Sequence, residues 1–372
     1  LWKNLKYEVN KPYGVSSNQK NKDAKLVTEI ERDLITKIKI ELNTLHSVNY
    51  NERMWTIILG PWLRRYSGLI VNRFHTIKQC FEEFNITETT LLNTNENILI
   101  KENSSDSYNA FNENLWNQHL LFELFKILNY KDLKINFVEY TKKTSAIKNN
   151  HKIKNFIIFK IKKITNFTNF LAIKNSTVTI QLYALYWEQF LIHLNLKIFP
   201  FFRFTNAIKT NDIIDQNLRD KLTRKILDSN KEYDAKDVAA LLLFKLLPKC
   251  YVEGFKTLIS ITDKTVFPHN PKHIITSVNC DTDEVFKLWL VKKIKSGALL
   301  TTYQHGNHYG THKYNNPSID ELISDKFITW GWKNDNNKYI ASQIFRKYDK
   351  LNQNKNYNLC SKIYLIENTI NP

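Results

Sequence analysis

The chain carries the stretch Ala298-Leu299-Leu300-Thr301-Thr302-Tyr303-Gln304-His305-Gly306-Asn307-His308-Tyr309-Gly310. Its apolar start is typical of a buried strand, and residues 304–310, here called the Gly/His loop, gather two histidines, two glycines and a tyrosine. Glycine permits positive φ and close backbone approach to a ligand, and histidine moves protons near neutral pH. Open α/β sheets bind ligands in such loops. The alternative is a hairpin turn with surface histidines.

The sequence on both sides of this loop predicts a parallel sheet. Residues 272–277 and 327–330 have the pattern of further strands, and acids at 281–284 cap a helix that runs to about Ser296. A short helix is expected at 319–323. Strands alternating with helices at these lengths imply right-handed crossovers. We therefore expect residues 277–279, the Gly/His loop and residues 331–332 to line one crevice.

The N-terminal part reads as helical. Apolar residues recur every three to four positions in 23–47, and 53–66 is apolar almost all round, as in a buried helix. Pro61 should kink that helix or begin a new one. His46, Arg53, Arg64 and Arg65 flank it, so they should be paired or face a cleft. Further helices are predicted at 70–84, 111–128, 183–194, 215–227 and 234–247, and further strands at 89–92, 98–100 and 178–182.

Composition narrows the class of protein. A net charge of +18 implies attraction to phosphates, anionic lipids or acidic glycans, unless it only reflects AT-rich coding. The lysine-rich stretch 131–163 is expected to be a solvated face, with contact to an anionic membrane surface as the second interpretation. No apolar run is long enough to span a bilayer, and no nucleic-acid-binding motif is present, so we expect no nucleic-acid partner.

Cysteine spacing bears on the compartment. The four cysteines lie far apart with no CxxC pair, which argues against a zinc site and a disulfide framework, and in favour of a reducing compartment. We expect a cytoplasmic protein, with any membrane association peripheral to the inner face. Neither a metal site nor a cofactor is indicated.

The chain divides into four predicted segments. These are a helical N-terminal part of an acceptor-side domain (1–130), a basic linker or helical insertion (131–255), a parallel α/β core with the Gly/His loop (256–360), and the first strand of a truncated C-terminal domain (361–372). The chain opens with Leu1, and its last predicted strand, 361–366, would need a further domain to join. We therefore expect a fragment that lacks both ends.

Several motifs carry a family resemblance. Gly60-Pro61-Trp62-Leu63, Gln304-His305-Gly306 with Tyr309-Gly310, and Thr329-Trp330-Gly331-Trp332 look like the GPWL, QHGGxYG and TWGW motifs of bacterial transferases of surface-carbohydrate biosynthesis. Residues 271–279 and 286–289 also match, and the order agrees over most of the chain. Two departures are Asn307, where the family has a second loop glycine, and Pro12-Tyr13-Gly14, which lacks an expected histidine.

The resemblance implies a fold and an activity. It implies an α/β, GT-B-like fold: a helix-rich, Rossmann-like N-terminal domain with a parallel sheet, and a second nucleotide-binding domain that is largely missing here. The family is distantly similar to nonulosonate and Kdo transferases that use CMP-activated sugars. The implied partners are a nucleotide-sugar donor and a glycan acceptor. A polyol-phosphate or other non-glycosyl transferase, and a non-catalytic carbohydrate-binding or scaffold subunit, remain alternatives.

Glycosyl transfer needs a base for the acceptor hydroxyl or a donor group for the leaving phosphate. His305 can serve as either, so we take it as the catalytic candidate. Loop amides can bind an anion. The substrate-binding candidates are Gln304, Gly306, His308, Tyr309, Gly310, Ser277, Asn279, Lys287, His46 and Arg53. Helical periodicity alone suggests that Lys287 is an exposed residue.

Overall fold

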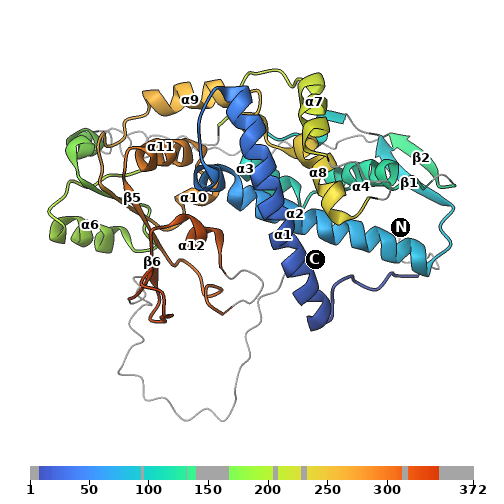
Figure 1. Cartoon of the computed structure of the whole chain (residues 1–372), viewed down its shortest axis with the longest axis horizontal. Coiled ribbons are helices and arrows are strands. Elements are labelled where there is room, and N and C mark those ends of the chain that lie inside the picture. Colours follow the sequence, from blue (N-terminus) through green and yellow to red (C-terminus); the bar gives the residue numbers. More distant parts are fainter. Residues whose placement is uncertain are drawn as a thin grey trace, which may run out of the picture.

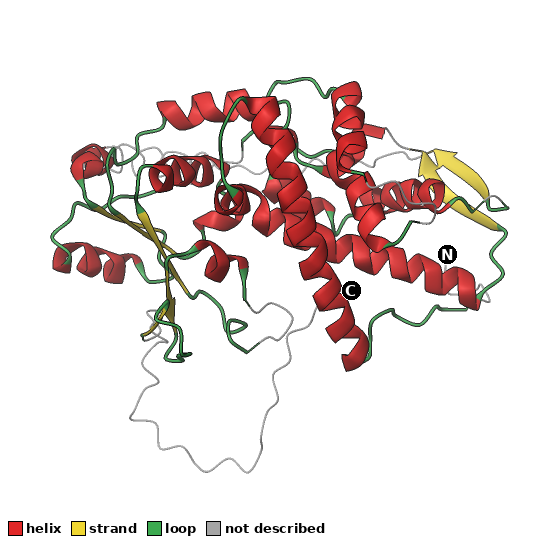
Figure 2. Ribbon diagram, viewed as in Figure 1, coloured by secondary structure: helices red, strands yellow, loops and turns green. Residues whose placement is uncertain are grey.

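Helices dominate the molecule, and a parallel sheet occupies one side of it (Figures 1 and 2). The structure, a computed structural model, describes residues 8–93, 96–130, 132–139, 167–203, 208–227, 233–311 and 317–342. The helices are α1 (Ser17–His46), α2 (Glu52–Glu83), α3 (Ser104–Ala110), α4 (Asn114–Leu128), α6 (Tyr186–Asn195), α7 (Gln216–Ile226), α8 (Ala235–Leu246), α9 (Phe255–Lys264), α10 (Asn279–Thr282), α11 (Glu284–Lys295) and α12 (Ile319–Ile323). The strands are β1 (Glu88–Asn93), β2 (Lys134–Glu139), β3 (Thr177–Ile180), β4 (His273–Thr276), β5 (Leu299–Tyr303), β6 (Lys326–Thr329) and β7 (Tyr339–Ala341).

The larger sheet has five strands in the order β3-β4-β5-β6-β7, and every neighbouring pair is parallel. Thr276 of β4 pairs with Thr302 of β5, and Tyr303 pairs with Ile328 of β6. Parallel strands put their carboxyl ends at one edge, so the residues after β3, β4, β5 and β6 meet there. The predicted α/β class, rich in helix with a parallel sheet, is confirmed.

Two strand predictions need correction or extension. Residues 98–100 were expected to be extended, but Glu96–Leu99 form a short 3-10 helix whose Leu99 is buried in the core. Strands β2 and β7 were not predicted: β2 pairs with β1 in a separate parallel pair, and β7 closes one side of the large sheet. Both are short, and the apolar side chains of β2 are largely exposed, so little in their sequences marks them as strands.

The division into four segments stays a prediction. Strand β3 lies within the segment 131–255, yet it is hydrogen-bonded to β4 of the following segment. Residues 140–166, which hold most of the basic stretch, and the strand expected at 361–366 lie outside the described residues.

Helix α2 runs through the middle of the fold and explains the Gly60-Pro61 pair. Pro61 neither ends nor restarts the helix, which continues to Glu83. A Cβ on Gly60 would lie 3.2 Å from Cγ2 of Ile319 on α12, so the glycine lets α12 pack closely on α2. The following residues, Trp62 and Tyr66, are fully buried and stack at 4.8 Å. The sequence at this point therefore fixes the distance between the helical part and the sheet.

One continuous hydrophobic core joins the helices to the sheet. Its buried members come from α1, α2 and α8 as well as from β3, β4, β5 and α11. Helix α2 packs against α1 and α8 on one side and against α10, α11 and α12 on the other. Within the described ranges, no helix is both long and apolar enough to cross a membrane.

Candidate active site

A pocket of about 250 Å³ opens at the carboxyl edge of the sheet, between α2, α10, the Gly/His loop and α12. Its lining residues are Pro61, Arg64, Arg65, Val278, Asp281, His305, His308, Tyr309, Ser318, Ile319 and Asp320. Three of the predicted site residues, His305, His308 and Tyr309, are brought together here. The pocket thus combines imidazoles, guanidinium groups and carboxylates in one concave site, as expected of an active site.

His305 is linked to a carboxylate through Tyr309. The Tyr309 hydroxyl donates to Oδ2 of Asp320 at 2.6 Å and lies 3.0 Å from Nδ1 of His305. Because the single phenol proton goes to Asp320, the imidazole N–H donates to the Tyr309 oxygen. Nε2 of His305 lies 3.2 Å from the same hydroxyl oxygen, so both ring nitrogens face Tyr309. His308 stacks on Tyr309 at 4.3 Å, so the loop's aromatic residues form one packed group.

Burial shifts the pKa values of these groups. Desolvation lowers the pKa of His305, partly opposed by the nearby Asp281 carboxylate. Desolvation also raises the pKa of Asp320 to about 6, against the effect of the Tyr309 hydrogen bond. Burial together with Asp320 raises the pKa of Tyr309 well above its ordinary value. At pH 7, therefore, His305 is neutral, Tyr309 is protonated and Asp320 is mostly ionised.

Two arginines of α2 form the cationic wall of the pocket. Arg64 donates through Nε to Glu31 at 2.8 Å and through an NH group to the Pro317 carbonyl at 2.8 Å. Arg65 makes two hydrogen bonds to Asp281 and lies over the Tyr108 ring at 4.0 Å. Both side chains are paired, as expected for charges beside a buried helix, and both also line the pocket. Fixed guanidinium groups of this kind suit an anionic ligand.

Gln304 holds the Gly/His loop to the end of β6. Its side-chain oxygen accepts from the Trp330 amide at 2.9 Å and from the Trp332 indole at 2.8 Å, and its side-chain nitrogen donates to the Gly306 carbonyl at 2.7 Å. Gln304 is almost fully buried and does not line the pocket. The structure thus gives Gln304 a positioning role rather than contact with a ligand.

The loop glycines are also explained by packing. Gly310 has φ of 72°, and a Cβ there would lie 3.0 Å from the Trp332 ring. A Cβ on Gly306 would lie 2.9 Å from the ring of His308. Both glycines let side chains approach the backbone closely. Neither lines the pocket.

Ser277 and Asn279 follow β4 but have internal partners. The Ser277 hydroxyl accepts from the backbone N–H of Tyr183 at 3.1 Å, which fixes the turn after β3 beside His305. Asn279 accepts from the Thr276 hydroxyl at 3.1 Å. Both side chains are 1% exposed. They shape the carboxyl edge, and neither lines the pocket.

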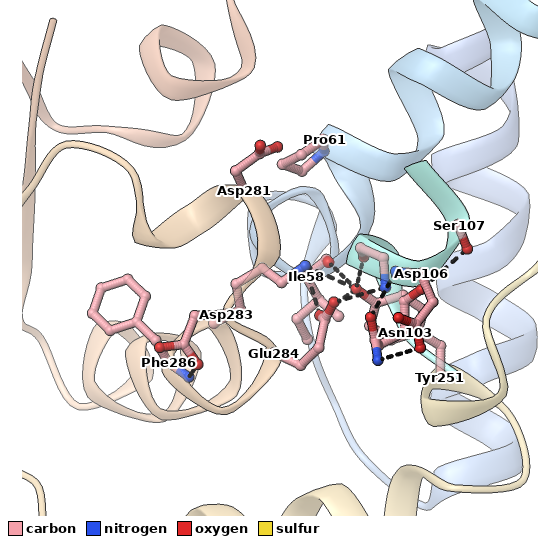
Figure 3. Close-up of polar contacts among 12 residues, drawn as sticks. Ile58, Pro61, Asn103, Asp106, Ser107, Tyr251, Asp281, Asp283, Glu284 and Phe286 are labelled. Carbon is pink, nitrogen blue, oxygen red and sulfur yellow. Dashed lines mark hydrogen bonds and ion pairs between the residues drawn. The ribbon is translucent and has the colours of Figure 1, made fainter. Parts of the chain in front are cut away.

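Lys287 lies in a fully buried polar network, so the expectation of an exposed helix residue was wrong. Its ammonium group is 2.6 Å from Oε2 of Glu284 and donates to the Tyr251 hydroxyl at 2.8 Å. Glu284 also accepts from the Ser104 amide, and Tyr251 bonds to Ser104 and to the Ile58 carbonyl. Glu284 and Tyr251 thus join α11 to α2 and α3, and both are labelled in Figure 3.

His46 and Arg53 lie away from this pocket. His46 bonds to the Tyr251 carbonyl at 2.9 Å and stacks on Phe255 at 4.1 Å, and burial lowers its pKa to about 4. Arg53 pairs with Asp325 at 2.7 Å and with the Ile323 carbonyl. It lines a second pocket of about 350 Å³ between α1, α2 and α12. The two residues are therefore not brought together with His305.

Asp281 and Asp320 were not predicted as site residues. Asp281 looked like one of several helix-capping acids, although Asp283 is the residue that caps α11. Asp320 lies on the five-residue α12, where its sequence surroundings give no sign of function. It meets Tyr309 because α12 packs beside the Gly/His loop, a contact that the local sequence does not reveal. In the described residues, no group of three or more His, Cys, Asp or Glu side chains is arranged to hold a metal ion.

The chain was compared with known proteins. It shows no significant similarity to a curated protein, and none to a solved structure. The family model described as "LIC12162 family transferase" matches residues 1–370, nearly the whole sequence. The match includes Gly60 and Pro61 of α2, the Gly/His loop and residues 330–332. The chain therefore belongs to the LIC12162 family of transferases.

Proposed function

We propose that the chain transfers a sugar from a nucleotide-activated donor to a glycan acceptor in cell-surface carbohydrate biosynthesis. The proposed donor is a CMP-activated sugar of the nonulosonate or Kdo class, and the proposed architecture is GT-B-like. Membership of a transferase family supports the reaction type. The observation that carries the proposal is the neutral imidazole of His305 in a pocket with two arginines at the carboxyl edge of a parallel sheet.

His305 is proposed as the general base. An imidazole nitrogen of His305 accepts the proton of the acceptor hydroxyl as that oxygen attacks the anomeric carbon and the bond to the leaving phosphate breaks. The imidazolium that forms is stabilised by the ionised Asp320, whose charge reaches it through Tyr309. A base works best with a pKa near the working pH, and burial keeps that of His305 low enough for the neutral form to dominate at pH 7.

The arginines are proposed to bind the anionic part of the donor. Arg64 and Arg65 are held in place by Glu31 and Asp281, so little side-chain entropy is lost on binding. A carboxylate on the sugar or the leaving phosphate matches the fork of a guanidinium group. His308, on the opposite wall, is proposed to contact the same ligand.

Nucleotide release from CMP- and UDP-sugars tests the proposal. The chain is incubated with each donor and a glycan acceptor, and free CMP or UDP is measured. His305→Ala should abolish release with little change in melting temperature, whereas His269→Ala, at an exposed position outside the pocket, should leave release unchanged.

Two results would count against glycosyl transfer by this site. One is release of nucleotide by His305→Ala at the wild-type rate. The other is a loss of thermal stability in His305→Ala as large as its loss of activity, which would make His305 a structural residue. Transfer of a polyol phosphate without consumption of a nucleotide sugar would support the non-glycosyl alternative instead.

A further inference from the structure

Helix α6 exposes an apolar stripe to solvent. Trp187, Phe190, Leu191 and Leu194 recur at spacings of three and four, so they lie on one face of the helix. Their exposed fractions are 65%, 37%, 40% and 57%. The Trp187 and Phe190 rings stack on each other at 5.6 Å. A contiguous apolar surface that is exposed to solvent usually marks a binding site.

The orientation of α6 is fixed by its inner face. His193 is 1% exposed, and its Nε2 lies 2.7 Å from the hydroxyl of Thr179 on β3. Glu188 accepts from the Leu185 amide and so caps the start of the helix. The apolar stripe is therefore exposed on α6 while His193 is buried against β3. Segments on either side of β3 expose further aromatic side chains, Phe170 (67%) and Phe199 (53%).

Cations border the end of this helix. Lys197 lies just after the last residue of α6. Lys174 also lies near this end of the helix, because the side chain of its neighbour Asn175 donates to the Phe199 carbonyl at 2.8 Å. The backbone amide of Lys272 donates to the Ser176 carbonyl at 2.7 Å. Lys174, Lys197 and Lys272 are all exposed. Glu188 is the only acidic residue between 167 and 203. The surroundings of the stripe are thus positive, as is the whole chain at +18.

We infer that the apolar stripe of α6 docks on a bilayer surface that contains anionic lipids. The stripe places Trp, Phe and Leu side chains at the headgroup boundary, as in helices that lie in the plane of the membrane. Lysines at the helix end meet the negative headgroups, and each contributes to binding within a Debye length. A second copy of the chain fits this face less well, because two strongly positive surfaces repel each other. The inference does not depend on the proposed reaction.

Vesicle flotation tests the inference with the full chain. Vesicles of phosphatidylcholine alone are compared with vesicles that also contain phosphatidylglycerol. The wild-type chain should float with the anionic vesicles and remain unbound with the neutral ones. Trp187→Ser/Leu194→Ser should weaken binding by about tenfold or more, since each buried side chain contributes substantially. The control Ile40→Ser removes an equally exposed apolar residue (59%) from α1 and should bind as wild type.

Five outcomes would overturn the inference. The first four are no flotation with anionic vesicles, equal binding to neutral vesicles, an equal effect of Ile40→Ser, and a changed oligomeric state. If the wild type is a dimer that Trp187→Ser/Leu194→Ser converts to a monomer, the occupant is a second copy. A loss of melting temperature in that variant, absent in Ile40→Ser, would also overturn it, because the stripe would then pack against the chain itself.

Discussion

The charged ammonium group of Lys287 on α11 is fully buried. Its ammonium group, the Glu284 carboxylate and the Tyr251 hydroxyl satisfy one another in the core behind the pocket. A buried pair of this kind gives little net stability compared with a well-packed apolar pair, but removal of one partner is costly. The network therefore fixes how α11 meets α2 and α3 more than it stabilises the fold.

Replacement of this lysine should strongly destabilise the protein. Lys287→Met leaves the Glu284 carboxylate buried without its cation, which costs about 3–5 kcal/mol. Urea denaturation measures the change in the free energy of unfolding. Lys292→Met on the same helix is the matched control, because Lys292 pairs with Asp263 at the surface, where a pair contributes about 0–1 kcal/mol. Equal effects of the two substitutions would contradict the structure around Lys287.

Asp320 links stability to pH. Its pKa is about 6 in the folded chain against an ordinary value of 3.8, so the folded state holds the proton more tightly than the unfolded state. The stabilising contribution of the protonated form is fully present below pH 3.8 and is lost as pH rises through 6. Ionised Asp320 thus opposes folding at neutral pH. This cost fits a residue retained for function rather than stability.

Asp320→Asn should therefore raise the melting temperature at pH 8 and change it much less at pH 4.5. Thermal unfolding of wild type and variant at the two pH values measures the difference. Asp335→Asn, at an exposed position near the end of β6, serves as the control and should have the same small effect at both. A variant that is less stable than wild type at pH 8 would show that the Asp320 charge is well compensated.

At the scale of elements, the Gly/His loop and the end of β6 form one unit. Gln304 joins the two segments with three hydrogen bonds, and Gly310 packs against the face of Trp332. His305 and Tyr309 lie between Gln304 and Gly310, the two loop residues that contact the end of β6. These contacts therefore fix the positions of His305 and Tyr309. The shape of the site thus depends on residues that do not line the pocket.

Gly310→Ala tests this unit. The substitution places an L residue at φ of 72°, which costs roughly 1–2 kcal/mol, and brings a Cβ to 3.0 Å from the Trp332 ring. Gly297→Ala is the matched control, because Gly297 also has positive φ but has nothing within 4 Å of the added Cβ. We expect Gly310→Ala to lower the free energy of unfolding more than Gly297→Ala. Equal losses would mean that the Trp332 contact is readily relaxed.

At the scale of the whole molecule, α2 connects the helical part with the sheet. Its buried residues belong to the single hydrophobic core that extends from α1 and α8 to β5 and α11. The helical part around α1 and α8 and the part that contains the sheet, both visible in Figure 1, therefore share their main stabilising contacts. A shared core makes separate unfolding of either part unfavourable.

We accordingly expect one cooperative unfolding transition. Far-UV circular dichroism reports mainly on the helices, and tryptophan fluorescence reports on residues of both parts, including Trp62 and Trp289. Their urea midpoints should coincide. Separate midpoints would indicate that the helices and the sheet unfold independently, and that the contacts of α2 with α11 and α12 contribute little.

The sequence alone determined the order of the elements and the place of the loop. The period of apolar residues predicted α1, α2, α8 and strands β3 to β6, because burial of one face leaves a periodic pattern in the chain. The parallel sheet followed from strand and helix alternation, and the Gly/His loop from its residue types. His305, His308 and Tyr309, which line one pocket, were therefore proposed as site residues from local sequence alone.

Tertiary structure decided which polar groups meet. Asp320 reaches Tyr309, Asp281 reaches Arg65, and Glu284 reaches Tyr251 through contacts between different elements of the fold. The sequence pattern of α11 could not show that Lys287 is buried, because the helix carries three further lysines, Lys292, Lys293 and Lys295, and its pattern does not distinguish Lys287 from them. Local patterns record which face of an element is buried, whereas the partner of a polar side chain is set by packing between elements.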